Sequence, residues 1–366
     1  MKILIISQNS YPKVSPRAFR TAELAEQLVK QGHEVVVYSV CENYDYSDYS
    51  RRTGVVMKNI KTFFFKDGNV GNRRINVFDR LLFHFFKNTL FWPHIEFHFR
   101  VGRIIRDNPN MDLLITIAFP HTIHTGAARA KKKYPSKFPK LWISDCGDPF
   151  TLNPFINVSK RFVRLEKEWC SLTDYITVPT SESIKGYYSE FKDKIKIIPQ
   201  GFDFSKTPID VYQPNSVPTF VFVGTVYPGV RDPRSFMDYL LTYPKPYKFK
   251  LLMTSPLEEE YIEKSDGRIQ YIIGLNRPEV IKECSKAEFL INIINPSSVQ
   301  SPSKLIDYGI ARRPILDISS NFREVDLFKR FIIGDYSESH IIEDLDSFKI
   351  ETVAAKFLAL ANKEKN

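Results

Sequence analysis

The sequence predicts an α/β protein made of two doubly wound, Rossmann-like domains, each a parallel sheet with helices on both faces. Three observations support this prediction. The chain opens with a strand, a helix and a second strand, and strand and helix signals alternate as far as residue 318. A turn-rich, proline-marked stretch interrupts the alternation at residues 201–218. The 366 residues also suffice for two domains of about 150–200 residues each.

The first strand–helix–strand unit occupies residues 2–40. Residues 2–7 form an apolar run, and residues 16–32, "PRAFRTAELAEQLVKQG", carry apolar side chains at helical spacing. Gly32 suits the position after the helix C-cap, where a left-handed backbone is common. The following "HEVVVYSV" is a second strand, so the unit predicts parallel strands joined by a right-handed crossover.

Further strands are expected in both halves of the chain. In the first half they fall at residues 55–65, 113–117, 141–144, 175–179 and 195–198. In the second half they begin at Phe220 and continue at residues 249–253, 269–273, 289–294 and 315–318. With residues 201–218 as the linker, we expect one domain over residues 1–203 and another over residues 204–350.

Composition indicates a globular protein with a basic surface. Hydrophobic residues make up 43% and charged residues 26% of the chain, which excludes a disordered protein, and no apolar run is long enough to span a membrane. The start "MKILIIS" lacks the length of a secretory signal, and the four cysteines show neither zinc-ligand spacing nor a disulfide framework. We therefore expect a cytoplasmic protein.

The net charge of +10 favours a partner that carries negative charge. No helix-turn-helix, RNP-type strand or zinc-finger spacing is present, so nucleic acid is not the expected partner. A lipid-linked diphosphate or the anionic inner face of a membrane fits the charge. Basic residues that serve only solubility are the alternative.

The most informative segment is "LINIINPSSVQSPSKLIDYGIARRPIL", residues 290–316. Its apolar start is typical of a buried parallel strand, and a polar loop leads from it to a short helix opened by Ser303, Lys304 and Asp307. Ser303 is suited to cap the first turn, whose free N–H groups and dipole attract anions. Because open α/β sheets bind nucleotides at the carboxyl ends of their strands, the segment predicts a nucleotide site.

This segment also resembles a known signature. "SPSKLIDYGIARRPIL" is similar to the donor-binding motif P-S-K-[LF]-x-[ED]-Y-x-A-x-x-[PK]-[IV] of glycosyltransferase family 4. Four further passages resemble that family and follow its order along the chain: "SPRAFRTAELAEQLVKQGHEVVVYS", "LWISDCGDPF", "LTDYITVPTSESIKGYY" with "IKIIPQGFDF", and "FVGTVYPGVRDPRSFMDYL". The resemblance implies the GT-B fold, in which two Rossmann-like domains face each other across a cleft. It also implies that a closing helix, residues 351–362, packs back on the first domain.

The resemblance further implies an activity. Such an enzyme moves a sugar from a nucleotide-diphosphate sugar to a glycan or lipid-linked acceptor with retention, and related bacterial enzymes build capsule or lipopolysaccharide. Residues 1–203 would bind the acceptor and residues 204–350 the donor. No protein nucleophile is implied, because the leaving phosphate takes the proton of the acceptor. We expect no metal and no other cofactor, since cations and a helix N-terminus can take the place of an ion at the diphosphate.

The donor residues follow from the positions that match the family. Arg231 and Lys304 are the candidate catalytic cations, because preorganised donors stabilise the charge that builds on the β-phosphate. Gly224 lets the backbone approach the diphosphate, and Asp307 stands where the family acid holds the ribose hydroxyls. The alternatives are that Arg231 is a solvated loop charge and that Lys304 forms a surface ion pair with Asp307.

Two positions depart from the family pattern. Thr225 follows the strand glycine, where many members have an arginine, and Val299 replaces a glutamate that usually contacts the donor sugar. We therefore expect the polar loop, which also contains Asn295 and Ser297, to contact the sugar. Its candidate donor-binding residues are Ser298 and Gln300, and Thr225 and Ser303 complete the donor set.

The acceptor side of the first domain is less regular. The loop "SQNSYPKVSPR" lacks the Gly-Gly pair that family members often place after the first strand. Asn9, Ser15 and Arg17 are therefore the candidates for the acceptor or the diphosphate.

Two further loops of the first domain supply titratable groups. In "ITIAFPHTIHTGAARA", His121 is a candidate to orient the donor sugar, and an ordinary histidine at a helix start is the alternative, which we prefer for His124. In "SDCGDP", either an aspartate accepts the proton of the acceptor hydroxyl, or both form turns ahead of a proline. Asp148 is the catalytic candidate, and Asp145 is the acceptor-binding one.

Residues 75–106 are dense in aromatic and basic side chains. Such segments lie in a membrane interface, or they form core helices whose aromatic rings pack under the sheet. The lysines of "ARAKKKYPSKFPK" would add attraction to anionic lipids. A peripheral position on the inner membrane face is thus one prediction.

Two other functions compete with sugar transfer. A sugar-nucleotide epimerase of the same fold would need cleft carboxylates, which Val299 does not supply. A non-catalytic binding subunit is suggested by Thr225 and Val299. Product analysis separates the epimerase, and a nucleotide-release assay separates the binding subunit.

Overall fold

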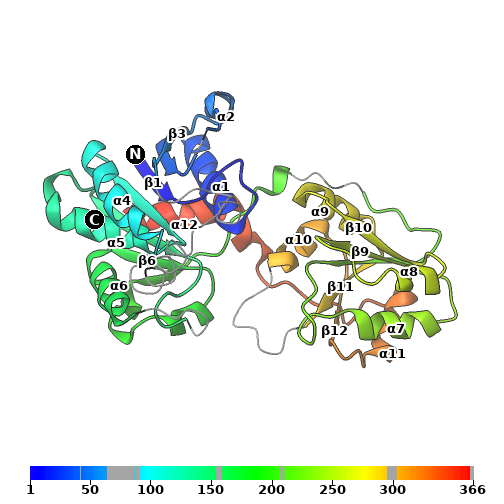
Figure 1. Ribbon diagram of the computed structural model, residues 1–366. Helices are drawn as coiled ribbons and strands as arrows, with labels where there is room; N and C mark the ends of the chain where they lie inside the picture. Colours follow the sequence, from blue (N-terminus) through cyan, green and yellow to red (C-terminus); the bar gives the residue numbers. More distant parts are fainter. Residues whose placement is uncertain are drawn as a thin grey trace. The chain divides into compact units, whose positions relative to one another are not determined.

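A computed structural model of the protein describes residues 1–41, 43–63, 86, 91–153, 159–206, 209, 211–294 and 303–362. The chain forms two compact units, Met1–Phe202 with Ser347–Asn366, and Asp203–Asp346 (Figure 1). The division made from the sequence placed the first boundary one residue later, at 203/204, and the second four residues later, at 350/351. None of the described helices is long and apolar enough to cross a membrane.

In the described part of the first unit, a seven-stranded sheet has the order β3-β2-β1-β4-β5-β6-β7, and all neighbouring strands are parallel. The strands are β1 (Lys2–Ser7), β2 (Glu34–Ser39), β3 (Val56–Asn59), β4 (Leu113–Ala118), β5 (Leu141–Cys146), β6 (Tyr175–Val178) and β7 (Ile195–Ile197). The helices are α1 (Pro16–Lys30), α2 (Ser47–Thr53), α4 (Ile95–Asp107), α5 (Thr122–Lys133), α6 (Lys160–Leu172) and α12 (Ile350–Asn362), with 3-10 turns at Pro135–Lys137, Glu182–Gly186 and Ser189–Lys194.

In the described part of the second unit, a five-stranded parallel sheet has the order β10-β9-β8-β11-β12. The strands are β8 (Thr219–Val223), β9 (Lys248–Met253), β10 (Ile269–Ile273), β11 (Phe289–Ile293) and β12 (Ile315–Ile318). The helices are α7 (Arg234–Thr242), α8 (Glu260–Lys264), α9 (Arg277–Ser285), α10 (Ser303–Ala311) and α11 (Val325–Ile332), with 3-10 turns at Phe204–Lys206 and Leu345–Phe348. The prediction of two doubly wound α/β domains is confirmed.

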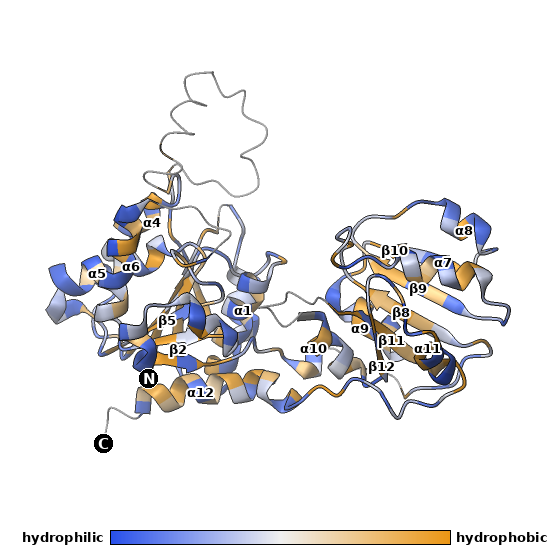
Figure 2. Cartoon of the chain, turned by 90° about the horizontal axis from the view of Figure 1, so that it is seen from below, coloured by the Kyte–Doolittle hydropathy of each residue, from blue (hydrophilic) through white to orange (hydrophobic). Residues whose placement is uncertain are grey.

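Both sheets are hydrophobic along their strands, as parallel sheets covered on both faces must be (Figure 2). In the first unit, Leu24 and Leu28 of α1 share a core with Val353 and Phe357 of α12. Helix α12 therefore packs beside α1 on one face of the first sheet, although more than 300 residues separate the two in the sequence (Figure 1).

The ends of α1 follow the local signals of the sequence. The hydroxyl of Ser15 accepts a hydrogen bond from the amide of Ala18 at 3.2 Å, and Pro16 opens the helix. Gly32 follows the C-cap with φ of +85°, so its predicted role after the helix is confirmed.

The region after β2 differs from the expectation. The predicted strand over residues 55–65 is shorter, because β3 ends at Asn59, whose side chain accepts from the amide of Lys61 at 2.9 Å and forms a turn. The preceding helix α2 was not predicted. It is held by Tyr49, which is buried and stacks on Tyr11 with 4.5 Å between the ring centres.

Candidate functional site

The second unit has its topological switch point between β8 and β11, which lie side by side although β9 and β10 come between them in the sequence. Open α/β sheets bind ligands outside the carboxyl ends of the strands at this point. The loop after β8 carries Arg231, and Lys304 lies on α10, which follows β11. Both predicted cations therefore follow the carboxyl ends of neighbouring strands in the second sheet.

Lys304 is held in an unusual state for a lysine. Its side chain is only 6% exposed, and its Nζ lies 4.9 Å from the ring centre of Phe222 on β8. Within the described residues, Nζ has no hydrogen-bond partner. Burial and the nearby charge of Arg231 lower the pKa of Lys304 to about 7, against the opposing influence of Asp317. The alternative of a surface ion pair between Lys304 and Asp307 is therefore wrong.

Arg231 points a second buried donor into the same place. Its Nε is buried without a hydrogen-bond partner among the residues described. Two backbone hydrogen bonds between Arg231 and Tyr227, of 2.9 and 3.0 Å, hold the loop in a tight turn. Gly224 begins this loop with φ of +132°, a conformation that strains any residue with a side chain. The two basic side chains thus offer the positive charge and the unpaired N–H groups that an anion such as a diphosphate requires.

Asp307 has an ion-pair partner that the sequence did not indicate. Its Oδ1 accepts from Nε of Arg277 at 2.8 Å and lies 2.7 Å from the Nη2 atom of that arginine. Burial raises the pKa of Asp307, and Arg277 partly opposes this. Arg277 follows Asn276, which forms a capping box with Glu279 at the start of α9. That capping pattern is visible in the sequence, but the reach of Arg277 to α10 is not.

Tyr308, the next residue of α10, fixes the helix to the switch point. Its buried hydroxyl donates to the carbonyl of Ile291 on β11 and accepts from the amide of Val223 on β8, both at 2.9 Å. The hydroxyl thus joins the two strands that flank the switch point. Because Lys304 lies one helical turn before Tyr308 on α10, this contact also holds Lys304 over the end of β8.

A third group of polar side chains lies on β11, on β12 and in the segment after α11. Asp317 accepts from Asn292 at 2.6 Å and lies 2.8 Å from Nδ1 of His340. Asn292 is buried, and its Oδ1 has no partner in the described part of the chain. Asp317 is also the carboxylate that favours the charged form of Lys304. No sequence motif pointed to these three residues.

The remaining donor residues are only partly visible. Thr225 is exposed in the loop after β8. Ser303 is the first residue of α10, which makes it a helical residue and not the residue before the helix. Ser298 and Gln300, with Asn295, Ser297 and Val299, lie outside the described residues.

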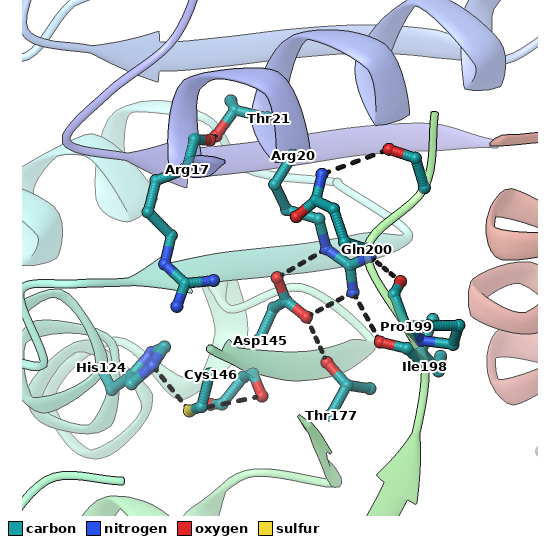
Figure 3. A network of polar contacts seen from close by, with 12 residues as sticks. Arg17, Arg20, Thr21, His124, Asp145, Cys146, Thr177, Ile198, Pro199 and Gln200 are labelled. Carbon is teal, nitrogen blue, oxygen red and sulfur yellow. Dashed lines mark hydrogen bonds and ion pairs between the residues drawn. The ribbon is translucent and has the colours of Figure 1, made fainter. Parts of the chain in front are cut away.

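In the first unit, Asp145 is buried in an ion pair (Figure 3). Arg20 of α1 donates from Nε and Nη2 to its two carboxylate oxygens at 3.0 and 2.8 Å, and Thr177 donates to Oδ1 at 2.7 Å. Both charged side chains are 4% exposed. Arg20 also donates to the carbonyls of Ile198 and Pro199. Asp145 lies within β5, so the predicted strand end at residue 144 and the turn-forming alternative were wrong for this residue.

Arg17 and Asp148 form a second, more exposed pair at 3.3 Å, with side-chain exposures of 21% and 53%. A Cβ at Gly147 would lie 1.2 Å from Nη2 of Arg17, so any larger residue there would displace the guanidinium from its present position. Figure 3 shows Arg17 extending from α1 beside Asp145. Both predicted residues therefore lie at the carboxyl ends of β1 and β5.

The other two acceptor candidates have local hydrogen bonds. The hydroxyl of Ser15 caps α1, and the side chain of Asn9 accepts from Lys13 at 3.3 Å. Asn9 and Ser15 flank the loop after β1, next to β4 at the switch point of the first sheet.

His121 directly precedes α5, and its ring stacks on Phe150 with 4.6 Å between the ring centres. It is 2% exposed, and burial together with the charge of Arg17 lowers its pKa to about 3. His124 lies within the first turn of α5 and is fully buried. Both imidazoles are consequently neutral at neutral pH.

Known proteins resemble this chain in sequence and in structure. The family described as Glycosyltransferase Family 4 matches residues 19–206, just over half of the chain. No curated protein sequence matches it. A glycosyltransferase from Rickettsia africae is 11% identical with a TM-score of 0.62, covering 99% of this chain and 98% of that one.

Two further solved structures are similar over the full length. HepE of Anabaena, in complex with UDP, is 10% identical with a TM-score of 0.61, and 99% of this chain and 100% of that chain are covered. The lipopolysaccharide outer core galactosyltransferase WaaB, in its apo form, is 14% identical with a TM-score of 0.60, and both chains are covered to 100%. Likeness at such low identity shows the fold, and the predicted GT-B fold class is confirmed.

Proposed function

Because the chain belongs to glycosyltransferase family 4, we propose that it transfers a sugar from a nucleoside-diphosphate sugar to a glycan or lipid-linked acceptor, with retention. One observation carries this proposal. Arg231 and Lys304 place buried N–H donors together at the switch point of the second sheet, and these donors have no partner in the described part of the chain. A diphosphate supplies the negative charge and the acceptor oxygens that they lack.

The same pair has a role in the reaction. As the glycosidic bond breaks, negative charge builds on the β-phosphate, and fixed cations in a place with little water stabilise it strongly. Lys304 is fixed by Phe222 and α10, and Arg231 is fixed by its turn, so neither needs to reorganise during the reaction. Asp307, held by Arg277, remains our candidate for the ribose hydroxyls.

The first unit supplies the proposed acceptor residues. Arg17 and Asp148 follow β1 and β5, the two strands on either side of β4, and lie at the carboxyl ends of the strands, where ligands of such sheets bind. We propose that Asp148 contacts the acceptor hydroxyl, together with Asn9. The fully paired Asp145 instead holds α1 and the segment after β7 in place.

A donor screen tests the proposal. HepE is described with UDP and with UDP-glucose, which makes UDP-sugars the first donors to examine, followed by GDP- and CMP-linked sugars. Ligand binding raises the melting temperature by mass action, so a thermal-shift screen finds the donor and a transfer assay with product analysis follows. Release of nucleotide with a new glycosidic bond is expected. An epimerised sugar nucleotide, or no turnover with any donor, would contradict the proposal.

The acceptor class follows from charge and from one relative. WaaB is described as a lipopolysaccharide outer core galactosyltransferase, and the net charge of +10 suits an acceptor that carries phosphates. We therefore propose a role in capsule or lipopolysaccharide synthesis, with a hexose or related sugar transferred.

We predict that transfer requires no divalent metal ion. On the proposed placement of the diphosphate, Arg231 and Lys304 supply the positive charge that a metal ion would otherwise provide. Activity should therefore persist after dialysis against excess chelator. The sequence contains an Asp-x-Asp pair, Asp344 and Asp346, with both residues exposed. Loss of activity that Mg²⁺ or Mn²⁺ restores would contradict the prediction and point to these carboxylates.

We also propose reversible docking of the first unit on an anionic membrane. Of the predicted segment, residues 86 and 91–106 are described. Phe97 and Val101 of α4 are fully buried, as expected if this segment forms a core helix. Phe99 of the same helix is instead 56% exposed, and the guanidinium of Arg129 lies 5.1 Å from its ring centre. A hollow of about 430 Å³ beside this pair is lined by Arg129 and Lys133, among other residues.

Liposome co-sedimentation measures this docking. Lys131 and Lys132 already form ion pairs with Asp174 and Glu168, so we expect Phe99→Ser and Lys133→Gln to weaken binding more than changes at those two lysines. Binding should rise with the anionic lipid fraction and fall with salt. Ile341→Ser removes an apolar residue that is 81% exposed in the second unit and is the matched control. Equal sedimentation of the Phe99 and Ile341 variants would contradict the proposal.

A further inference from the structure

Three potential metal ligands meet in the core of the first unit. The ligand atoms of His121, His124 and Cys146 all lie within 4.8 Å of one another, and all three side chains are buried. They come from the start of α5 and from the last residue of β5, two neighbouring parts of the fold. Sequence spacing could not indicate this cluster, because the cysteine lies more than 20 residues from either histidine.

The two histidines are in the neutral form that binds a metal ion. Burial lowers the pKa of both rings, so at neutral pH each offers a lone pair with no proton to displace. Nδ1 of His124 lies 2.8 Å from the hydroxyl of Thr116, which also accepts from the indole of Trp142 at 2.8 Å. This contact orients the ring and leaves Nε2 directed at Sγ of Cys146, 3.3 Å away (Figure 3).

His121 supplies an unpartnered nitrogen. Its Nδ1 is buried and has no hydrogen-bond partner among the described residues, while the ring also bonds the backbone of Asp148. A buried nitrogen without a partner costs free energy, which coordination to an ion would recover. The ring is fixed by Phe150 on one side, so the nitrogen has a defined direction.

The surroundings suit an added positive charge. Burial raises the pKa of the Cys146 thiol, and the nearby carboxylates of Asp145 and Glu166 raise it further, while Tyr187 and Arg17 oppose them. Glu166 is fully buried, and in the described part of the chain its Oε1 has no partner. A divalent ion would offset the charge of both a thiolate and this carboxylate.

We propose that His121 Nδ1, His124 Nε2 and Cys146 Sγ bind one zinc ion. Two imidazoles and a thiolate select zinc over magnesium or calcium, which prefer oxygen ligands. Zinc lies about 2.0–2.3 Å from such ligands, which sets tetrahedral ligand atoms about 3.3–3.6 Å apart. Atoms that lie within 4.8 Å of one another therefore need to approach by about 1.5 Å at most. Binding releases the thiol proton of Cys146 to solvent, and the fourth position is open to water. The residues of this site belong to the first unit, whereas those of the proposed diphosphate site belong to the second, and the zinc proposal does not depend on the proposed function.

Cobalt substitution tests the site in the full-length protein. Metal-free protein titrated with Co²⁺ should develop a thiolate-to-cobalt charge-transfer band that saturates at one equivalent, and Zn²⁺ should displace the cobalt. Cys146→Ser should abolish the band. Cys284→Ser changes another buried, free cysteine, in the second unit, and should leave the band unchanged.

Histidine variants provide a second measurement. His121→Gln and His124→Gln keep the thiol and should weaken Zn²⁺ affinity at least tenfold, while tryptophan fluorescence verifies that each variant is folded. A charge-transfer band that survives in Cys146→Ser, or wild-type protein that binds no Co²⁺ and no Zn²⁺, would overturn the proposal. So would histidine variants that are folded and bind Zn²⁺ as tightly as the wild type.

Discussion

Replacing Lys304 with methionine, or Arg231 with alanine, is expected to weaken binding of UDP by about tenfold to a hundredfold. Each replacement removes a charge-assisted hydrogen bond to the diphosphate, which contributes about 1.5–3 kcal/mol. Methionine preserves the packing of the side chain on Phe222, so the loss reports the ammonium group and not a cavity. Isothermal titration calorimetry with UDP, or with the nucleoside diphosphate of the donor found by screening, measures the change in Kd.

A neighbouring arginine provides the control for this experiment. Arg234 belongs to the same sequence segment, but its guanidinium is paired with Asp232 at 2.7 Å and with Glu258 at 2.9 Å. Arg234→Ala should leave the Kd within about twofold of the wild-type value, since such surface pairs contribute little. If the Lys304 and Arg231 variants bind the nucleotide as tightly as the wild type, the diphosphate lies elsewhere.

The substitution Asp145→Asn should destabilise the first unit by about 3–5 kcal/mol, because it leaves the guanidinium of Arg20 buried without a counter-charge. Arg20 also lies 5.0 Å from the ring centre of Phe357 on α12, so its displacement would disturb the packing of the closing helix. All three tryptophans, Trp92, Trp142 and Trp169, belong to the first unit. Urea unfolding followed by tryptophan fluorescence therefore reports the stability of this unit.

The neighbouring ion pair gives a matched control. Asp148 lies three residues later, and its pair with Arg17 is partly exposed, so Asp148→Asn should cost less than about 1 kcal/mol. Equal effects of the two substitutions would contradict the distinction between a structural Asp145 and a functional Asp148.

The ion pair also makes the stability of the first unit depend on pH. Burial raises the pKa of Asp145, but Arg20 and Thr177 outweigh this effect, so the pKa is lowered overall. The stability from this pair is thus present above about pH 4 and is lost as the pH falls further.

Much of the fold could be predicted from local sequence patterns. The strands of parallel sheets are apolar runs, and α1 has both a serine cap and a C-terminal glycine, so these elements carry their own signals. The same holds for the segment after β11, where the strand, the loop and the helix with Lys304 follow in order. Helix α2 carried no such signal, because it depends on a contact between Tyr49 and Tyr11 that brings together distant residues.

The candidate site was predictable only where a motif carried it. Arg231 and Lys304 lie in passages that resemble the family, and the structure brings them together. Asp307 lies on the helix that the sequence predicts, but its partner Arg277 lies 30 residues earlier, on a different helix. The pairing of Asp317 with His340 and of Asp145 with Arg20 likewise depends on tertiary contacts across 23 and 125 residues. Such pairs have no local period or cap that a sequence could display.

The pH dependence of nucleotide binding tests most directly whether Lys304 contacts the diphosphate. Its pKa of about 7 in the free protein should rise when the anion binds, so the lysine contributes fully to affinity below pH 7 and progressively less above it. The terminal phosphate of UDP has its own pKa near about 6, so the ligand charge is constant between about pH 7 and pH 9. Calorimetry over this range should show the Kd of wild-type protein rising with pH, by up to about tenfold per unit, and the uptake of one proton on binding near pH 8. Lys304→Met should show a weaker but constant Kd and no proton uptake, whereas the same pH dependence in both proteins would contradict the placement of the diphosphate at Lys304.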